Sequence, residues 1–455
     1  MRSRAICGHL MLASLIAPVK GVFGQASTSG TPEQPAPAPP PSSYSTAQTP
    51  QYEPAAGAGY STSPSGSRLA GTSQLGGGPP EGQSQLFTTG EGLLEWGMVH
   101  LYPHFVYQLS YGNGVAAVPG QQVDTMVNSF SPGVLVRLGP HWSLDYTATL
   151  TTYSSSQLKN AFDQAVGLNG TTAYEDWVFG VAIGFSDTSQ PLVETGAQTD
   201  QQVFSTVLTA GYQLNSKVSF SLSFNQSFRF ASEATQSAPG TAPGQLSDLT
   251  EWSTLDWVNY QVLPTVSVGL GVGVTYDSLS VGPDIVSEQA QARLQWIVGK
   301  RLSAYLSGGL NDQQYVGSSV GDFLSPIFSL TLQYQLFEAT SLFVNASSGT
   351  SPSYYGGQAS QSTGISAGVH QRLLRRLFLD VSGGYWNTTY HATTASPNTP
   401  GLSDYDSASF NVALGTTLFK RLGASVFYNT LFNTSGSELY NYTTHEVGLT
   451  LSYSF

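Results

Sequence analysis

Apolar and polar side chains alternate with a period of two along most of the chain after residue 96. The run at residues 442–455 shows the pattern best: its odd-numbered residues from Val447 to Phe455 are apolar or aromatic. Its even-numbered residues, from Glu446 to Ser454, are small, polar or acidic. A period of two indicates a β-strand, because successive strand side chains point to opposite faces. This run is therefore predicted to be a strand with one apolar and one polar face.

Similar runs of ten to fourteen residues recur and predict about eighteen strands. The first covers residues 99–111, the seventh residues 218–230, and the ninth begins at Val266 and sets apolar residues against glycines. The eighth, at about residues 250–262, has no clear assignment of its two faces. Each run is long enough for the roughly 9–11 residues that a tilted membrane-spanning strand needs.

Connections between the predicted strands alternate in length. Short turns follow the even strands, and loops of roughly ten to twenty residues follow the odd ones, which is the asymmetry of outer-membrane barrels. The charges are sorted in the same way. Basic residues cluster at the short turns: Lys217, Lys300, Arg301, Arg375, Arg376, Lys420 and Arg421. Acidic residues are expected in the long loops: Glu194, Asp200, Asp248, Asp277, Asp284, Asp312, Asp322, Asp404, Asp406 and Glu438.

Composition and backbone chemistry favour a closed barrel that spans a membrane. Only 10% of the residues are charged, 12% are aromatic, and the mean hydropathy is -0.08. No run of 18 apolar residues could form a spanning helix. In hydrocarbon every backbone N–H and C=O must pair, so spanning strands must close into a barrel. The net charge of -12 argues against nucleic acid as a partner.

The first 90 residues differ from the rest of the chain. Residues 1–26 read as a secretory signal, with Arg2 and Arg4 before an apolar run. Residues 27–90 are rich in Pro, Ser and Gly and are predicted to be a disordered periplasmic tether, which could touch peptidoglycan. Residues 91–455 are predicted to form the barrel. Cys7 is the single cysteine and lies in the signal.

The sequence carries no catalytic signature of a hydrolase elbow, a phosphate-binding loop or a zinc protease. His100 and His104 share the inward face of the first strand, but no third ligand accompanies them. We therefore expect no enzymatic activity, no metal site and no cofactor.

Charged side chains on the predicted polar faces are the candidate pore-lining residues. They are Arg137, Asp145, Arg229, Arg293, His370, Arg372, Asp380 and Glu446. An Arg facing lipid would cost about 2–4 kcal/mol at the membrane midplane, which favours the inward assignment. These residues could select solutes, as charged rings do in channels, or could pair to brace the wall.

Several short stretches resemble the outer-membrane β-barrel porin families of Gram-negative bacteria. They are Trp142-Ser143-Leu144-Asp145-Tyr146, Glu175-Asp176-Trp177, Pro191-Leu192-Val193-Glu194 and Arg376-Leu377-Phe378-Leu379-Asp380. The resemblance covers about residues 97–455. It implies a barrel fold and an outer-membrane location, and it carries over no active-site residues.

The sequence thus predicts an all-β protein, a single transmembrane antiparallel barrel of about 18 strands in the cell outer membrane. Its expected function is passive diffusion of small hydrophilic solutes, with weak selectivity from inward charges and acidic outer loops. The alternatives are a structural or interaction barrel without open conductance, and the outer-membrane exit pore of an export system. Outer-membrane lipid, lipopolysaccharide and the barrel-assembly machinery are the expected partners. Phe455 is expected to be the assembly signal.

Overall fold

The computed structural model describes residues 94–454 except 119–120, 193, 195–196, 234–245, 300, 375, 395–403, 420 and 437–440. The predicted signal, the tether and Phe455 lie outside the described residues. The described residues form strands and no helix, so none of them forms a helix long and apolar enough to cross a membrane. The strands are β1 (Leu94–Trp96), β2 (Val99–Val118), β3 (Gln121–Leu138), β4 (Trp142–Tyr153), β5 (Ala161–Tyr174), β6 (Trp177–Leu192), β7 (Ala197–Gln213), β8 (Val218–Glu233), β9 (Leu249–Leu263), β10 (Val266–Leu279), β11 (Ile285–Val298), β12 (Leu302–Tyr315), β13 (Phe323–Phe337), β14 (Thr340–Pro352), β15 (Gln358–Leu373), β16 (Leu377–Ala392), β17 (Tyr405–Phe419), β18 (Leu422–Ser435) and β19 (Tyr442–Ser454).

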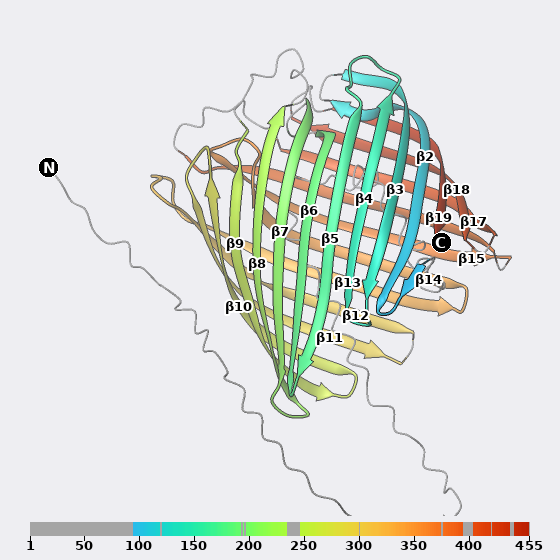
Figure 1. Ribbon diagram of the computed structural model, residues 1–455. Helices are drawn as coiled ribbons and strands as arrows, with labels where there is room; N and C mark the ends of the chain where they lie inside the picture. The colour runs from blue at the N-terminus through green and yellow to red at the C-terminus, as the bar shows by residue number, and fades with distance from the viewer. Residues whose placement is uncertain are drawn as a thin grey trace, which may run out of the picture. The chain divides into compact units, whose positions relative to one another are not determined.

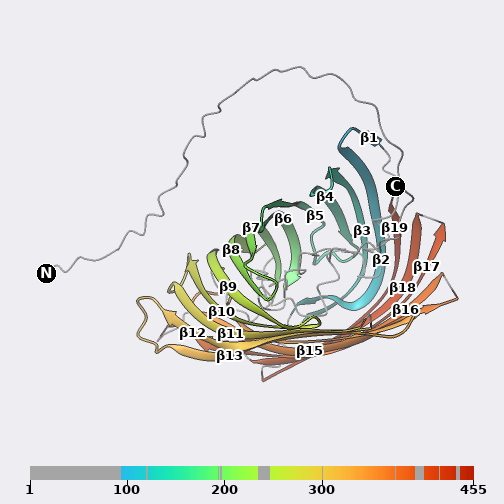
Figure 2. The ribbon, with the colours of Figure 1, turned by 90° about the horizontal axis from the view of Figure 1, so that it is seen from below.

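Eighteen of these strands, β2 to β19, close into one antiparallel barrel (Figure 1). Each strand pairs with its neighbours in sequence, and β19 returns to pair with β2 from His445↔Asn113 to Ser454↔His104. The short β1 adds three residue pairs to the start of β2. Seen from below, β2–β9 follow one side of the barrel and β11–β17 the other (Figure 2). The predicted closed barrel of about eighteen strands is confirmed.

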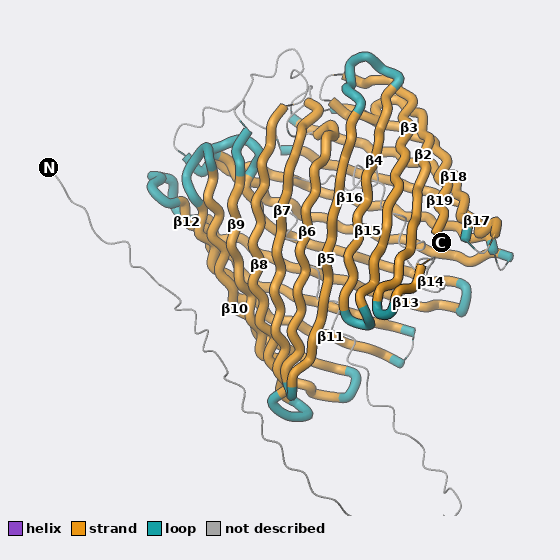
Figure 3. Tube along the Cα trace, in the orientation of Figure 1, coloured by secondary structure: helices purple, strands orange, loops and turns teal. Residues whose placement is uncertain are grey.

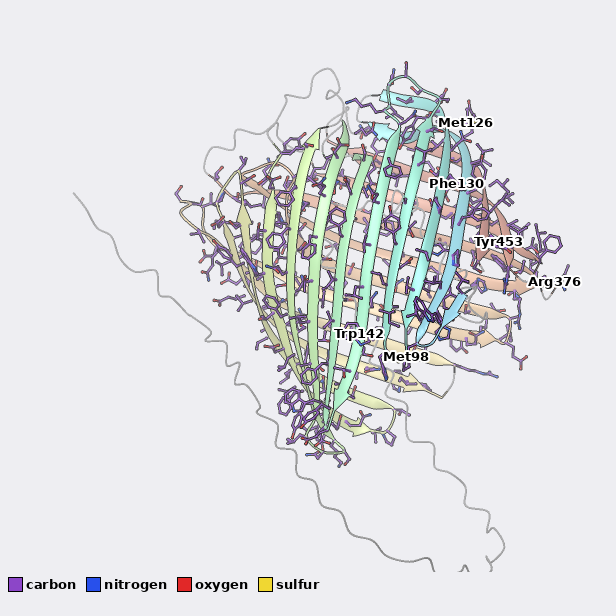
Figure 4. The ribbon with its side chains drawn as sticks, viewed as in Figure 1. Met98, Met126, Phe130, Trp142, Arg376 and Tyr453 are labelled. Carbon is purple, nitrogen blue, oxygen red and sulfur yellow. The ribbon has the colours of Figure 1, made fainter. Side chains whose placement is uncertain are left out.

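The two faces of the barrel wall differ as the alternation predicts. Large apolar side chains lie exposed on the outside, among them Phe130, Leu270 and Val272. The Phe105 ring lies between the rings of Phe130 and Tyr453 across the β19–β2 junction, with centroids 6.0 and 5.9 Å away. Figure 4 labels Phe130 and Tyr453. Among the described residues, buried polar side chains outnumber buried apolar ones, because the inner face is mainly Ser, Thr, Asn and Gln. The barrel therefore has an apolar exterior and a polar interior.

The short turns lie where the sequence places them, at one end of the strands (Figure 3). Gly139 and Gly299 adopt positive φ angles of 66° and 59° there, a conformation that glycine adopts without a steric cost. Lys217, Arg301 and Arg421 all lie in such turns. Trp142 and Trp177 each begin a strand directly after a short turn, as expected for an aromatic girdle at one end.

Most of the predicted loops are too long, because the strands extend further than the alternation indicates. Strand β2 runs to Val118, seven residues beyond its predicted end. The connections at the long-loop end, opposite the short turns, range in length from two residues (119–120) to fifteen (234–248). As a consequence four acidic residues expected in loops lie within strands instead: Asp200, Asp277, Asp312 and Asp406.

The structure also resolves the faces of strand β9. Glu251, Ser253 and Trp257 lie on the buried inner side, and Val258 and Tyr260 lie exposed outside. Asp256 falls on the outer face at the middle of the strand, opposite Val272 of β10. Its carboxylate accepts a hydrogen bond of 3.2 Å from the backbone N–H of Ser223. The β8–β9 ladder lacks the pairs of Leu222 and Ser223 at this point.

Candidate functional site

The predicted inward charges all point to the interior of the barrel, but they do not form a single site. Their strands, β3, β4, β8, β11, β15, β16 and β19, are distributed around the wall. Five of them stand in directly opposed pairs with polar residues. These are His100↔Arg137, Arg293↔Ser307, His370↔Asp380 and Asn429↔Glu446.

Several of these charges contact neighbours within the wall. His370 Nδ1 and Asp380 Oδ1 lie 2.5 Å apart, and His104 Nε2 lies 4.0 Å from Asp145 Oδ1. The Arg137 guanidinium lies over the Tyr102 ring, 5.1 Å from its centroid. Such contacts hold the inward charges against the wall.

Arg293, midway along β11, has the most complete set of partners. Its Nε donates to Asn259 Oδ1 at 2.8 Å, and its guanidinium lies 4.3 Å from the Trp257 ring centroid. Asn259 Nδ2 in turn donates to Ser221 Oγ at 3.2 Å. The residues come from β8, β9 and β11, so Arg293 braces three strands and covers the lumen face of Trp257.

A buried polar cluster lies near the long-loop end of the barrel interior. This Arg229 cluster consists of Glu194, Arg229, Glu251, Asp277 and Tyr354, each no more than 7% exposed. The Arg229 guanidinium stacks on the Tyr354 ring, 4.1 Å from its centroid. Glu251 and Asp277 stand directly opposite each other on β9 and β10. Arg229 therefore provides the positive charge for a group with three carboxylates.

Tyr354 belongs to the β14–β15 connection, residues 353–357, and reaches strands on another part of the wall. Five strands, β9 to β13, separate β14 from β8, so the contact with Arg229 passes through the interior. The Tyr354 backbone N–H and the Ser353 hydroxyl donate to Glu194 Oε1 at 2.8 and 2.5 Å. The connection is thereby fixed inside the barrel mouth and narrows it.

Further contacts hold the same connection in place. The Tyr354 hydroxyl donates to Gln201 Oε1 at 3.0 Å, and the Ser247 N–H donates to the Tyr354 carbonyl at 2.7 Å. Leu246 and Tyr355 pack with Tyr354 in a small apolar core. Burial raises the pKa of the Tyr354 phenol, so the hydroxyl stays neutral and remains a donor.

The sequence pattern places Arg229 on the inner face but does not identify the residues around it. Glu251 lies on the strand whose two faces the pattern does not distinguish, and the pattern places Glu194 and Asp277 in the outer loops. The one signal for Tyr354 is the adjacent pair Tyr354-Tyr355 in a connection otherwise made of Ser and Gly. Among the described residues, no group of three His, Cys, Asp or Glu side chains is arranged to hold a metal ion.

Comparisons with known proteins give structural matches only. No model of a protein family matches the chain, and no curated protein sequence is similar to it. Among solved structures, OpdO of Pseudomonas aeruginosa is similar, with a TM-score of 0.42 and 11% identity over 78% of this chain and 97% of that one. OccK2 (OpdF) of the same organism, in complex with glucuronate, matches with a TM-score of 0.42 and 12% identity over 78% of this chain and 98% of that one. The copper transporter OprC matches with a TM-score of 0.43 and 9% identity over 80% of this chain and 81% of that one.

Proposed function

We propose that the protein is an outer-membrane channel through which small hydrophilic solutes diffuse passively. The observation that carries the proposal is the closed ladder of eighteen strands with an apolar exterior and a polar interior. A lipid bilayer would cover the apolar exterior. In water, the exposed rings and aliphatic side chains around the whole barrel would remain in contact with solvent. Barrels of this strand number are wide enough for an aqueous passage.

The proposed selectivity is for cations and neutral solutes. Acidic residues on the inner face, including Asp145, Asp163 and Glu446, add to the Arg229 cluster with its three carboxylates. A surplus of negative charge raises the local concentration of cations at the passage. High salt should screen this preference, so a selectivity that does not fall with ionic strength would contradict the proposed cause.

A barrel without open conductance is the second candidate. The observation that favours it is the β14–β15 connection, which residues 194, 229 and 354 fix inside the mouth. In this candidate the barrel serves as a structural or interaction protein of the outer membrane. An exit pore for an export system would likewise hold a closed mouth until a partner opens it.

Single-channel recording of the purified full chain in planar lipid bilayers tests the proposal. We expect ohmic conductance steps that favour K⁺ over Cl⁻ in a salt gradient. Stable insertion, verified by heat-modifiable migration on a gel, with no conductance steps would refute the channel and support the structural candidate.

A further inference from the structure

On the wall formed by β14–β19, four of the inward aromatic side chains stand opposite glycines: Phe343, Phe378, Trp386 and Phe427. We call them the aromatic platforms. Each stands directly opposite a glycine of a neighbouring strand, in the pairs Phe343↔Gly368, Phe378↔Gly415, Trp386↔Gly364 and Phe427↔Gly448. The surrounding inner face is otherwise mainly Ser, Thr, Asn and Gly.

The rings of the aromatic platforms lie flat on the wall. A Cβ added to Gly368, Gly415 or Gly448 would come within 2.4, 2.2 and 2.2 Å of a ring atom of the opposing Phe. At Gly364 it would come within 2.0 Å of Trp386. The rings thus occupy the space that a side chain would fill. One ring face packs on the backbone, and the other faces the interior.

A purely structural role accounts for only part of this arrangement. Aromatic rings that cover glycines stabilise β-sheets, and this explains the paired glycines. Trp257 covers Gly271 in the same way on β9, but Arg293 stacks on its second face and only 4% of Trp257 is exposed. Among the described residues, no Arg or Lys stacks on the aromatic platforms, and all four are partly exposed. Their inner faces are therefore available to a solute.

The aromatic platforms are spread along the passage. Counted from the short-turn end, Phe378 is the second residue of its strand, Phe343 the fourth, Phe427 the sixth and Trp386 the tenth. At roughly 3.3 Å per residue, Phe378 and Trp386 lie about 26 Å apart along β16. A solute that leaves one ring face can therefore reach the next without crossing the whole passage.

Polar groups lie between the rings. Asn411 and Asn429 stand opposite each other on β17 and β18, and Asn429 donates to Glu446 at 3.2 Å. The His370–Asp380 pair lies next to Phe378, whose ring centroid is 6.0 Å from that of His370. Amides and carboxylates that flank an aromatic face can bond hydroxyl groups while the face contacts C–H bonds.

From this arrangement we infer that the β14–β19 wall binds neutral sugars as they pass through the barrel. A pyranose ring has an apolar C–H face that packs on an aromatic ring and a rim of hydroxyls for the flanking amides. The charged side chains near the rings are of both signs, since Arg372 stands opposite Phe378 and Asp380 lies on the same strand. The wall therefore favours no single sign of charge, which suits a neutral solute. The inference rests on the proposed channel function and names its substrate class.

Current block by maltotriose tests the inference. Added to a planar bilayer that holds open channels, maltotriose should interrupt the current in a concentration-dependent manner. A polyethylene glycol of similar size, which lacks a rigid C–H face, should interrupt it far less. Because an aromatic contact is worth roughly 0.5–1.5 kcal/mol, each of Phe343→Leu, Phe378→Leu and Phe427→Leu should weaken the block by about two- to tenfold.

Phe410→Leu is the matched control, since Phe410 lies on β17 and is exposed on the outer face. It should leave the maltotriose block unchanged. Equal block by maltotriose and polyethylene glycol, or block that the three inner substitutions leave unchanged, would overturn the inference. Should the protein conduct no current, calorimetric titration of the full chain in detergent separates the two failures. Maltotriose binding that Phe343→Leu weakens would then support the sugar site and refute only the channel, whereas no binding would refute both.

Discussion

The two sides of the barrel interior differ in what covers their aromatic side chains. On the side of β8–β12, guanidinium groups cover aromatic rings: Arg293 stacks on Trp257 of β9, and Arg229 stacks on Tyr354, which reaches across from the β14–β15 connection. On the side of β14–β19, the aromatic platforms keep one face toward the interior.

On the proposed channel function, this difference gives the polar inner wall two roles. Where Arg and carboxylates are buried together, each needs its partners, and the surrounding segments become fixed in one position. Where flat rings lie mainly among amides and hydroxyls, the rings need no buried charge partner, and on the proposed function this surface exchanges one solute for another. We therefore expect substitutions on the first side to change stability and mouth geometry, and substitutions on the second to change solute binding.

The largest effect is expected for Arg229→Ala. It removes the positive charge from a buried group with three carboxylates, and such a loss costs about 3–5 kcal/mol. The free energy of unfolding, measured by urea titration in lipid vesicles, should fall by that amount. The β14–β15 connection should also leave the mouth, so any single-channel conductance should rise.

Arg372→Ala serves as the control for this prediction. Arg372 also points inward, on β15, but its side chain is exposed, and its loss should change the unfolding free energy little. Equal stability losses for both variants would contradict the special role of the Arg229 cluster.

The next effect concerns Gly415→Ala on the second side. The new methyl group would come within 2.2 Å of the Phe378 ring and should push it off the wall, which weakens maltotriose block by roughly two- to tenfold. Gly349→Ala is the matched variant, because no atom lies within 4 Å of its added methyl. If both variants keep normal block, the flat position of Phe378 does not matter for binding.

Arg293→Ala should give the β8–β12 side an uncovered ring face like those of the β14–β19 side. Removal of the guanidinium uncovers Trp257, which already lies flat on Gly271, and so creates a further ring face. Maltotriose block should strengthen by about twofold, which corresponds to the lower end of the free-energy range of one aromatic contact. A weaker block in this variant would indicate that Arg293 itself contacts the sugar.

The smallest effect on stability is expected for Asp256→Asn on the outer face of β9. The amide oxygen can still accept from the Ser223 N–H, while the charge that faces lipid is removed. The unfolding free energy should rise by less than about 2 kcal/mol. Asp312→Asn, near the long-loop end of β12, is the control and should leave the unfolding free energy unchanged. A lower unfolding free energy for Asp256→Asn would contradict the prediction and would indicate that the Asp256 carboxylate has a partner outside the barrel.

Much of the fold follows from the sequence because alternation acts locally. Each barrel strand, beginning with residues 99–118, has its own apolar face, and charged or glycine-rich turns mark its short-turn end. The long-loop ends are harder to read: Asp277 and Asp312 resemble loop residues, yet pairing of β10 with β9 and of β12 with β11 continues past them. At the long-loop end, the length of a strand depends on how far its neighbour extends. The pattern of residues within one strand carries no information about that.

The interior contacts were predictable only in part. Inward charges could be assigned from strand parity, and all eight point inward. Their partners could not, since Glu194 and Tyr354 are 160 residues apart in the chain. The aromatic platforms are recognisable only when each ring is matched with its glycine on the next strand, which requires the register.

The junction of β19 with β2 also has a consequence for how the protein folds. Every other pair in the barrel joins neighbouring strands, whereas Leu449 and Leu109 meet across 340 residues of chain. Bringing such distant segments together carries an entropy cost that grows as the logarithm of the separation, about 5 kcal/mol for this length. Until that last ladder forms, β2 and β19 are two unpaired edges that can recruit strands from other molecules. Closure of this junction is therefore the step at which a catalyst of assembly has the most to accelerate, and at which a delay favours aggregation over the native barrel.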